Sequence, residues 1–505
     1  MQVVRDRAAR WVRIAAPAGV LVVAALFRFW ALGRPDTLVF DELYYVRDAV
    51  SQLTHGVPTT WPDDDPAFSG ARAAAFSEVA STVAHPPLGK WLIGLGILLF
   101  GPETGWGWRS AVAAAGVATV GVVMLLAWAM TRRLAVACAA GLLLALDGVH
   151  VVLTRVSILD GFLTLFIALG ALFMWHDLHR PEPSSRGWRR PWLVAAGMTF
   201  GAAAAVKWSG LYPLVAFLAL SVAAEWIRRR RGGARRPVWG ALARGASASA
   251  VALVAAFAVY LASWWGWIVG TNLGHRVEGQ PWWVSLAEWH GDSVAWHATL
   301  SAPHPYQAHP LTWPLGLRPT AMYESTWEAG ANCPWPEGCA AVVSPLPNLL
   351  ITWGGVAALL LLGWMLVRLA AQAMRRGDPL PVASPDLRAG AFVLVGYLSG
   401  WIPWLLTPSR SAVFQFYAVA LTPFAAIALA LVLGAVAQGH RPSSVLALSG
   451  IRLDDAPAAI RGRQLAVAVF LLVATVVSVL FFPVWSGAPV AEWFWRAHLW
   501  LPGWD

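Results

Sequence analysis

Apolar residues in this chain fall into long runs separated by short breaks rich in arginine, proline and glycine. A helix crosses a hydrocarbon core of roughly 30 Å with about 20 residues, which is the usual length of these runs. We therefore predict an all-α integral membrane protein with about 11 transmembrane helices. The predicted spans are 11–32, 108–130, 134–152, 158–175, 191–206, 211–227, 248–269, 348–367, 389–406, 413–437 and 465–482.

One further apolar run, 87–100, is short and contains Lys90. If this run lies in the membrane interface instead of crossing, every arginine cluster falls on the side of the N-terminus, as expected for cytoplasmic loops. We therefore predict an interfacial helix here, a cytoplasmic N-terminus, an outer C-terminus and a multi-pass location in the plasma (inner) membrane. The clusters are Arg132 and Arg133; Arg180, Arg186, Arg189 and Arg190; Arg228 to Arg231 with Arg235 and Arg236; Arg375 and Arg376; and Arg441, Arg452, Arg461 and Arg463.

The composition agrees with a single membrane domain that occupies residues 1–505. Hydrophobic residues make up 58% of the chain and charged residues only 13%, with a mean hydropathy of +0.57, whereas soluble domains carry roughly 25% charged residues. The arginine-rich start leads directly into the first predicted span, so we expect a permanent anchor there and not a cleaved signal. Because the net charge of +10 is explained mostly by topology, we expect no nucleic-acid partner.

Two long segments fall on the predicted outer side, and we expect function to reside there. The first, 33–107, contains an acidic motif and the predicted interfacial helix, and the second, 271–347, is a large loop rich in tryptophan. Lys90 and Lys207 are the only lysines in the chain. Both are predicted to lie on this outer side, against the usual bias of basic residues, which favours a functional role.

The acidic motif is FDELYYVRDA, which places Asp41 and Glu42 shortly after the first span. Two adjacent carboxylates repel one another, so one can act as a base while its neighbour orients or binds a substrate. The alternative is a helix start, with Asp41 as the cap and Glu42 in the first turn. A second acidic run, Asp63 to Asp65 in WPDDDP, is interpreted as a solvated loop, and we predict neither a metal site nor a cofactor.

Several cations are predicted to lie on the same side and are candidate ligands of a phosphate. Lys90 follows His85 in HPPLGK, and Lys207 lies in a short predicted outer turn. Arginine suits phosphate because its planar fork binds two oxygens at once. The alternatives are interface anchors for the arginines and snorkelling to lipid headgroups for Lys90. The candidate arginines are Arg109 in GWRS, Arg155 in LTRVSILD and Arg410 in TPSRSAVFQFY.

The second outer segment offers further candidates. His304 and Tyr306 in SAPHPYQAHP lie among many tryptophans, in a composition that suits stacking on a sugar or a peptide. Cys333 and Cys339 in CPWPEGC are interpreted either as a disulfide, which implies a non-cytoplasmic side, or as two free thiols.

Taken together, these motifs resemble the protein O-mannosyltransferase family, which are membrane glycosyltransferases of the GT-C type. The matching segments run in the family's order over nearly the whole chain. They are FDELYYVRDA, HPPLGKWLIGLG, GWRSAVAAAG, LTRVSILD, VKWSGLY, HPYQAHPLTWP, WIPWLLTPSRSAVFQFY, FFPVWSG and WLPGW.

This resemblance implies an inverting transfer of mannose from polyprenyl phosphate mannose to Ser or Thr hydroxyls of polypeptides that emerge on the outer face, for example after Sec translocation. It implies Asp41 as the general base, Glu42 as a supporting neighbour, and Arg109 and Arg410 as phosphate ligands. The family uses no metal. Residues 271–347 are too few for the β-trefoil MIR domain of eukaryotic members, so the resemblance is to the bacterial branch.

Three other functions remain open. A GT-C enzyme that mannosylates a glycolipid or a polysaccharide would need the same acidic pair and phosphate site, although HPPLGK and KWSG argue against it. An oligosaccharyltransferase is disfavoured because the expected WWD motif is absent. A transporter or lipid scaffold would place charges near the middle of the membrane, whereas these charges gather mostly at the ends of the predicted spans.

Overall fold

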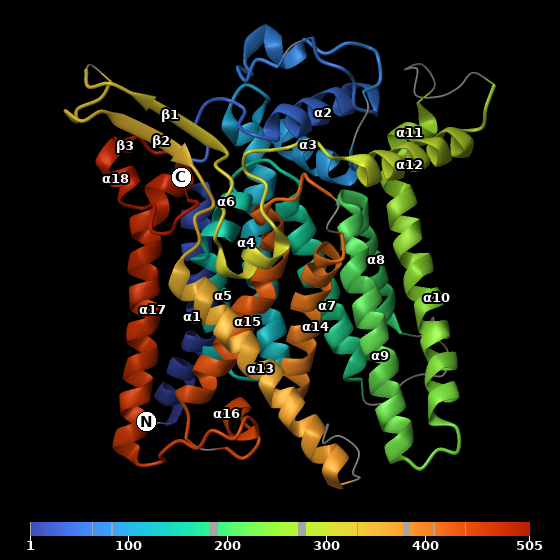
Figure 1. Ribbon diagram of the computed structural model, residues 1–505, viewed down its shortest axis with the longest axis vertical. Coiled ribbons are helices and arrows are strands. Elements are labelled where there is room, and N and C mark those ends of the chain that lie inside the picture. The colour runs from blue at the N-terminus through green and yellow to red at the C-terminus, as the bar shows by residue number, and fades with distance from the viewer. Residues whose placement is uncertain are drawn as a thin grey trace.

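The computed structural model is built almost entirely of helices that run along one long axis (Figure 1). It describes residues 2–62, 64–81, 84–180, 190–270, 279–330, 332–376, 384–407, 410–439 and 441–504, with side chains from residue 11 onward. Asp63, Arg186 and Arg189, which were named above, lie outside these residues.

Eight helical segments among the described residues have the length and hydropathy to cross a membrane, which makes this a multi-pass membrane protein. They are formed by α1 (Gln2–Phe29), α4 (Gly105–Thr131), α7 (Asp160–Leu178), α9 (Leu211–Arg231), α10 (Pro237–Ser263), α13 (Leu349–Arg376), α15 (Thr422–Val436) and α17 (Pro457–Ser486), with 3-10 turns leading into α9 (η3, Trp208–Gly210) and α15 (η5, Gln415–Leu421).

The other three predicted spans correspond to helices that fall short of these properties, so the count of eleven is not confirmed. The predicted span 134–152 is split into α5 (Leu134–Ala145) and α6 (Gly148–Leu153), because Asp147 begins a new helix by accepting the N–H of His150 at 2.8 Å. Helix α8 (Pro191–Val206) has only 16 residues, or roughly 24 Å at the usual rise. Helix α14 (Pro385–Leu405) begins with the polar residues Asp386 and Arg388.

The helices approach one another closely where small residues meet. At Gly197 on α8, an added Cβ would lie 2.4 Å from the carbonyl oxygen of Ala252 on α10. At Gly201, one helical turn later, it would lie 2.3 Å from the carbonyl oxygen of Ala256. Membrane helices have little hydrophobic drive to associate, so such close backbone packing supplies their attraction.

One end of the molecule, called here the loop-rich end, carries the long connections (Figure 1). It includes α3, which has 13 residues and a length of roughly 20 Å, too short for a span. The elements of this end are α2 (Glu42–His55), η1 (Gly70–Ala74), α3 (Leu88–Phe100), α11 (Trp265–Val269), α12 (Trp282–Thr299), η4 (Pro310–Leu315), β1 (Tyr323–Trp327), β2 (Cys339–Val343), β3 (Val490–Ala491) and α18 (Glu492–Arg496).

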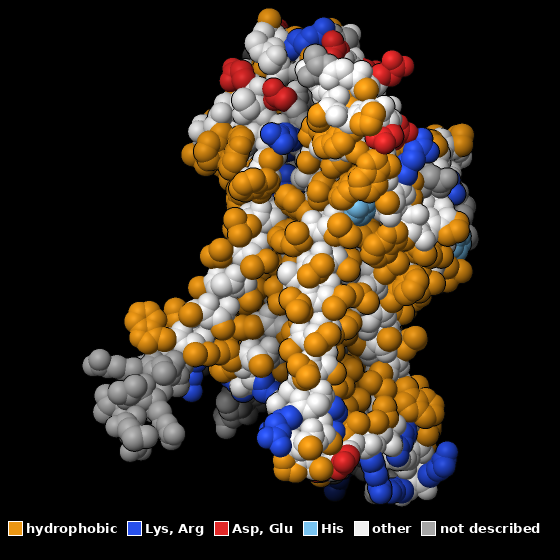
Figure 2. All heavy atoms as spheres, turned by 90° about the vertical axis from the view of Figure 1, so that its left-hand side faces the viewer, with side chains coloured by type: hydrophobic (Ala, Val, Ile, Leu, Met, Phe, Trp, Pro, Cys, Tyr) orange, Lys and Arg blue, Asp and Glu red, His pale blue; other side chains and the backbone are white. Residues whose placement is uncertain are grey.

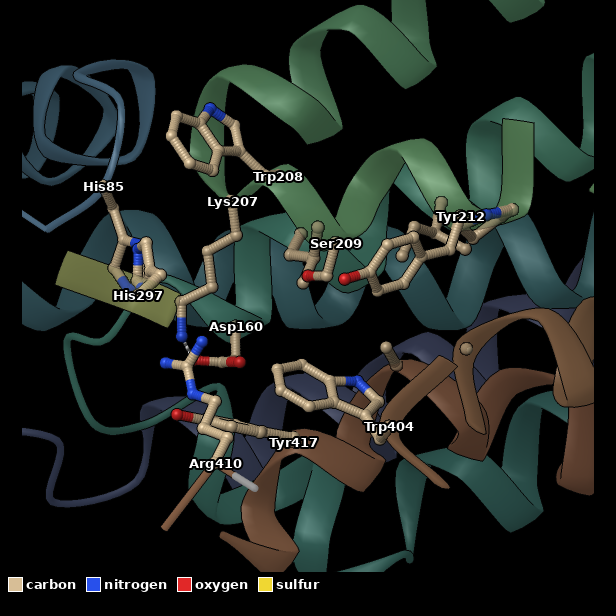
Figure 3. A pocket seen from close by; sticks show the side chains of 15 residues that line it. His85, Asp160, Lys207, Trp208, Ser209, Tyr212, His297, Trp404, Arg410 and Tyr417 are labelled. Atoms are coloured by element: carbon tan, nitrogen blue, oxygen red, sulfur yellow. Dashed lines mark hydrogen bonds and ion pairs between the residues drawn. The ribbon is translucent and has the colours of Figure 1, made fainter. Parts of the chain in front are cut away.

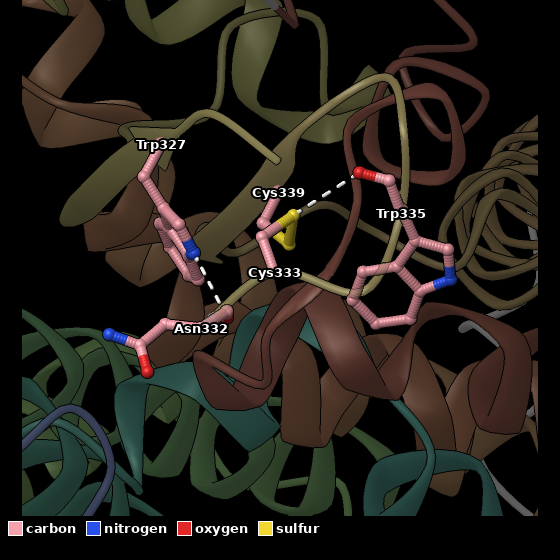
Figure 4. Close-up of a disulfide and its surroundings, with 5 residues drawn as sticks. All are labelled: Trp327, Asn332, Cys333, Trp335 and Cys339. Atoms are coloured by element: carbon pink, nitrogen blue, oxygen red, sulfur yellow. Dashed lines mark hydrogen bonds between the residues drawn. A yellow bond between two sulfur atoms is a disulfide. The ribbon is translucent and has the colours of Figure 1, made fainter. Parts of the chain in front are cut away.

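The small antiparallel sheet, of strand order β1-β2-β3, is absent from the all-α prediction. Its register pairs Trp327 with Cys339, and a disulfide joins Cys339 to Cys333 across the turn of the hairpin (Figure 4). The alternation of exposed and half-buried residues along β1 is typical of an edge strand with one covered face.

The opposite end, called here the basic end, carries the C-termini of α9 and α13 and the short helix α16 (Val445–Leu448) (Figure 1). The label of the N-terminus lies near this end and that of the C-terminus at the loop-rich end. Figure 2 shows apolar side chains along the middle of the molecule, Lys and Arg gathered at the lower, basic end, and most of the acidic side chains at the upper end. This distribution suits a protein with its middle in lipid.

Candidate active site

Asp41 and Glu42 lie side by side in the chain at the start of α2, in different surroundings. Asp41 occupies the N-cap position, but its side chain makes no capping hydrogen bond. The helix-start interpretation therefore does not account for the Asp41 carboxylate, which instead interacts with the hydroxyl of Tyr45 one turn later. Glu42 is fully buried.

Glu42 and Arg109 form a buried ion pair. The Nε and Nη2 groups of Arg109 donate to the two carboxylate oxygens of Glu42 at 2.8 and 2.7 Å. Glu42 also accepts the backbone N–H groups of Val39 at 3.0 Å and Ser157 at 2.7 Å. A buried carboxylate that accepts four hydrogen bonds from the protein is fixed in position and has little capacity left to bind a substrate.

The predicted phosphate contact of Arg109 is corrected by this geometry. Besides its two bonds to Glu42, Arg109 donates to the backbone carbonyl oxygens of Leu32 (3.3 Å), Pro35 (2.9 Å) and Thr37 (3.0 Å). A guanidinium has five N–H donors, and all five are directed at protein oxygens. Arg109 therefore holds the segment between α1 and α2 against α4 and has no N–H left for a ligand.

The predicted phosphate contact of Arg155 is also not supported by the geometry, because its guanidinium is directed at the end of α1. Its guanidinium is buried, lies 5.3 Å from the ring of Phe482, and donates to the backbone oxygens of Phe27 at 3.0 Å and Arg28 at 2.9 Å. These are carbonyls of the last turn of α1, which a cation stabilises. Arg155 thus anchors the end of a helix and does not face the cavity described next.

A cavity of about 170 Å³ opens at the loop-rich end between α7, α9, α12 and α14 (Figure 3). Its charged and polar lining consists of His85, Asp160, Lys207, Trp208, Ser209, Tyr212, His297, Trp404, Arg410 and Tyr417. The sequence had placed His85, Lys207 and Arg410 among the phosphate ligands, and the structure brings these three together.

The two cationic side chains of the cavity, Lys207 and Arg410, differ in how far their N–H groups have hydrogen-bond partners in the protein. Lys207 is buried and donates to the Asp160 carboxylate at 2.7 Å, and its ammonium lies 5.1 Å from the ring of Tyr417. Arg410 lies over the ring of Trp404 at 5.7 Å, and its Nε is buried without a hydrogen-bond partner within the described part of the chain. In Figure 3 the guanidinium of Arg410 converges on the pair of Lys207 and Asp160. Arg410 therefore has hydrogen-bonding capacity to offer a ligand.

Asp41 is within electrostatic range of this cavity. Burial raises the pKa of Asp41 to about 6, while the positive charge of Lys207 opposes the rise and the negative charge of Asp160 adds to it. A carboxylic acid with a pKa near neutrality is matched to proton transfer in a way that an ordinary aspartate is not.

His85 also lines the cavity, and its ring stacks on that of His297 with centroids 5.7 Å apart. Burial lowers the pKa of His85 well below its usual value, and the charges of Lys207, Lys90 and Arg410 lower it further. His85 therefore faces the cavity as a neutral ring that can accept or donate a hydrogen bond.

The remaining predicted residues border the cavity or lie apart from it. Lys90 pairs with Asp48 at 3.1 Å and donates to the backbone oxygen of His85 at 3.3 Å, so it supports the segment that carries His85. The ring of His304 lies 6.4 Å from that of Phe40, next to Asp41, and its Nδ1 accepts the backbone N–H of Tyr306. Cys333 and Cys339 lie in the hairpin, which Figure 1 shows on the other side of α2 from α12.

The sequence analysis did not single out Asp160, His297 or Tyr417 as site residues. Asp160 begins α7 in the motif LTRVSILD, where attention went to Arg155. His297 lies on α12, in a segment interpreted as loop, and the helix turns its ring toward Trp208 at 5.8 Å. The motif KWSG was the available signal for all three. Lys207 donates to Asp160 and lies 5.1 Å from the ring of Tyr417, and Trp208 lies next to His297.

No group of three or more His, Cys, Asp or Glu side chains that could hold a metal ion is found among the described residues. The polar groups of the cavity instead combine a partly satisfied arginine, a lysine and aromatic walls, next to a carboxyl group of raised pKa. Such a set suits a phosphorylated ligand and the removal of a proton close to it.

The helix bundle has the GT-C fold of membrane proteins, as its likeness to two solved structures shows. The protein O-mannosyltransferase complex Pmt1-Pmt2 of S. cerevisiae, solved with its sugar donor, aligns with a TM-score of 0.71 at 14% identity over 98% of this chain and 92% of that chain. ArnT from Cupriavidus metallidurans, solved with undecaprenyl phosphate, aligns with a TM-score of 0.50 at 18% identity over 97% of this chain and 76% of that chain.

Sequence similarity narrows the class to one family. Residues 76–266 match the family described as dolichyl-phosphate-mannose-protein mannosyltransferase, and residues 282–504 match the C-terminal four TMM region of protein-O-mannosyltransferase. The polyprenol-phosphate-mannose--protein mannosyltransferase of Mycobacterium tuberculosis is 31% identical, over 96% of this chain and 90% of that protein. The chain belongs to the protein O-mannosyltransferase family.

Proposed function

We propose that this enzyme transfers mannose from polyprenyl phosphate mannose to Ser or Thr hydroxyls of polypeptides, with inversion at the anomeric carbon. The observation that carries the proposal is the cavity that Arg410 and Lys207 line together, since the charge of Lys207 also acts on the carboxyl group of Asp41. The names of its relatives supply the donor class and the acceptor class.

Asp41 is the proposed general base. The acceptor hydroxyl gives its proton to Asp41 while its oxygen forms a bond to C1 of mannose. The bond between C1 and the phosphate oxygen breaks, and its electron pair leaves with the polyprenyl phosphate. The raised pKa of Asp41 supports this role, because it keeps the carboxylate basic enough to accept a proton at neutral pH.

Arg410 and Lys207 are the proposed stabilisers of the leaving phosphate. A phosphate needs no proton to depart, so cations placed before the reaction can replace a general acid. The buried and unpartnered Nε of Arg410 is available for this purpose. Lys207 is held by Asp160, which fixes the direction of its ammonium before the donor arrives.

Glu42 and Arg109 are proposed as positioning residues. They fix the first turn of α2, and with it the backbone of Asp41, to the end of α4. The four donors on Glu42 support a role in geometry, which differs from the substrate contact implied by the family resemblance.

The proposed location is the plasma membrane, with the loop-rich end and the active site outside. Two features support this orientation: arginines gather at the basic end (Figure 2), and a disulfide lies at the loop-rich end. The acceptors would then be polypeptides that emerge from the secretion machinery.

The test is a reconstituted reaction with polyprenyl phosphate mannose and a Ser/Thr-rich peptide. We expect Asp41→Asn to abolish mannosylation of the peptide, whereas Asp64→Asn, a matched change at a fully exposed carboxylate of the same segment, leaves it intact. Full activity in Asp41→Asn would disprove the role of the base. Mannose on lipid but never on peptide would favour the glycolipid-modifying alternative.

A further inference from the structure

A second, larger cavity of about 430 Å³ lies at the basic end, between α7, α9, α13 and α14. Its walls are mainly apolar, with Leu220, Ile227, Leu366 and Leu369 among the lining side chains. The active-site cavity is bordered by α7, α9 and α14 at the loop-rich end, so this cavity belongs to the other end of the same helices.

An aromatic contact lies between the two cavities along these helices. Phe217 of α9 and Phe392 of α14 stack with ring centroids 4.5 Å apart. Phe392 lines the cavity at the basic end, and Tyr212 of α9, further toward the loop-rich end, lines the active-site cavity. The basic-end cavity is thus a separate site and not an extension of the donor site.

Three arginines line the mouth of this apolar cavity: Arg228 and Arg231 at the end of α9, and Arg388 in the first turn of α14. Arg228 pairs with Glu225. The side chains of Arg231 and Arg388 make no hydrogen bond or ion pair with any described residue. No carboxylate is found among the described residues that line the cavity.

The neighbouring carboxylates are engaged elsewhere. Glu225 binds Arg228 and Arg229, and Asp177 binds Arg190. Asp386, next to Arg388 in sequence, interacts with the charges of Arg133 and Arg441.

The next cavity along this end, between α7, α9 and α10, provides a contrast. Its lining includes two carboxylates, Asp177 and Glu225, together with four arginines, so its positive charge is partly offset by residues of the cavity itself. The positive-inside bias accounts for arginines at this end in general. What sets Arg231 and Arg388 apart is that these exposed guanidinium groups border a large apolar cavity, because charge and apolar surface side by side match the two parts of a phospholipid.

We infer that this basic-end cavity binds an anionic phospholipid. The phosphodiester would lie between Arg231 and Arg388, with Arg228 beside it, and the acyl chains would cover Leu220, Leu366 and Leu369. Basic pockets between transmembrane helices suit anionic headgroups, and guanidinium groups bind phosphate oxygens in pairs. The site is distinct from the donor site of the proposed function and does not depend on it.

The test uses the purified full-length protein in detergent and counts bound palmitoyl-oleoyl phosphatidylglycerol by native mass spectrometry. We expect the double variant Arg231→Gln/Arg388→Gln to bind this lipid about tenfold more weakly, from the loss of charge-assisted hydrogen bonds. The matched control is Arg375→Gln/Arg376→Gln, which removes two exposed arginines of the same end outside the cavity and is expected to bind normally.

A second variant tests whether the lipid binds in the cavity itself or is attracted only to the positive charge of the arginines. Ala391→Phe fills the cavity and keeps every arginine, and we expect it to weaken binding as well. Equal binding by the double variant and its control would overturn the proposal, as would phosphatidylcholine binding as tightly as phosphatidylglycerol. Arginine-dependent binding of undecaprenyl phosphate, without phosphatidylglycerol, would also overturn it and indicate a second donor-lipid site. All these readouts measure lipid and not mannose transfer, so the proposed function can fail or hold independently.

Discussion

The neighbouring residues Asp41 and Glu42 place their carboxyl groups in two different regions of the loop-rich end. The charged groups of these two regions differ in how fully they are paired within the protein. Around Glu42, every donor of Arg109 meets an oxygen, and the ionic pair is closed. Around Asp41, the carboxyl group has a raised pKa and the nearby Arg410 retains an unpartnered Nε. Saturated charges hold a fold in place, whereas unsaturated ones are available to a substrate.

The largest expected effect is a loss of activity on substitution of Asp41, in the region that we propose contacts the substrate. We predict that Asp41→Asn lowers kcat of peptide mannosylation by about 10²- to 10⁴-fold, which is the range for loss of a general base. Its melting temperature is expected to equal or exceed that of the wild type, because a buried carboxylate with a raised pKa does not stabilise the charged state. A large fall in melting temperature would place Asp41 with Glu42 among the structural groups.

Arg410→Gln tests the proposed phosphate contact in the same region. We predict a loss of about 10²- to 10³-fold in kcat, comparable to the removal of one preorganised donor to a developing charge. The measurement is initial rates at saturating donor, with Arg318→Gln, a partly exposed arginine of the same end, as the control. Equal losses in both variants would contradict a specific role for Arg410.

Arg109→Gln is the corresponding change in the region around Glu42, and we expect it to lower the stability of the folded protein. Removing one partner of a buried ion pair costs about 3–5 kcal/mol, because it leaves the other charge unpaired. We expect a lower melting temperature in detergent and a smaller yield of folded protein. The rate per folded molecule should fall less than in Arg410→Gln. A larger fall in this rate for Arg109→Gln than for Arg410→Gln would indicate that Arg109 is a phosphate ligand.

The pH dependence sharpens the comparison. A base works only when deprotonated, so kcat/KM should rise with pH through about 6, the pKa of Asp41, and level off above it. An unperturbed aspartate would give an acid limb near pH 4. An acid limb that stays near pH 4 would show that the titrating group is not Asp41.

The smallest effect is expected at the hairpin disulfide. The bond closes a short loop between Cys333 and Cys339, so its removal costs only about 2 kcal/mol by chain entropy. We predict that Cys333→Ser/Cys339→Ser keeps mannosylation within about twofold of the wild type and loosens the hairpin, as measured by hydrogen exchange. Loss of most activity would indicate that the hairpin participates in the reaction.

Much of this architecture was predictable because the bilayer imposes a simple pattern on sequence. Runs of about 20 apolar residues located the long helices, and the shortness of 87–100 identified α3 as something other than a span. The break between α5 and α6 was missed because Asp147 lies inside an apolar stretch, and the sheet was missed because β2 is fully buried and does not alternate.

The site was only partly predictable, since residue type indicates chemistry but not partners. Lys207 and Arg410 were chosen for their charge, and the structure places both in one cavity. Arg109 and Arg155 carry the same charge, yet Arg109 directs all of its donors at Glu42 and backbone carbonyls, and Arg155 donates to the carbonyls at the end of α1. His297 could not be placed from sequence, because its approach to His85 depends on how α12 packs.

The contacts of Glu42 also set an order of assembly during synthesis. Its carboxylate is complete only when the backbone of Ser157, 115 residues later, has reached it. Lys207 follows Ser157 in the chain, and Arg410 comes after most of the chain has been made. If Arg410 holds the donor as proposed, the site is complete only after most of the spans have been made, and chains that end before residue 410 are expected to be inactive.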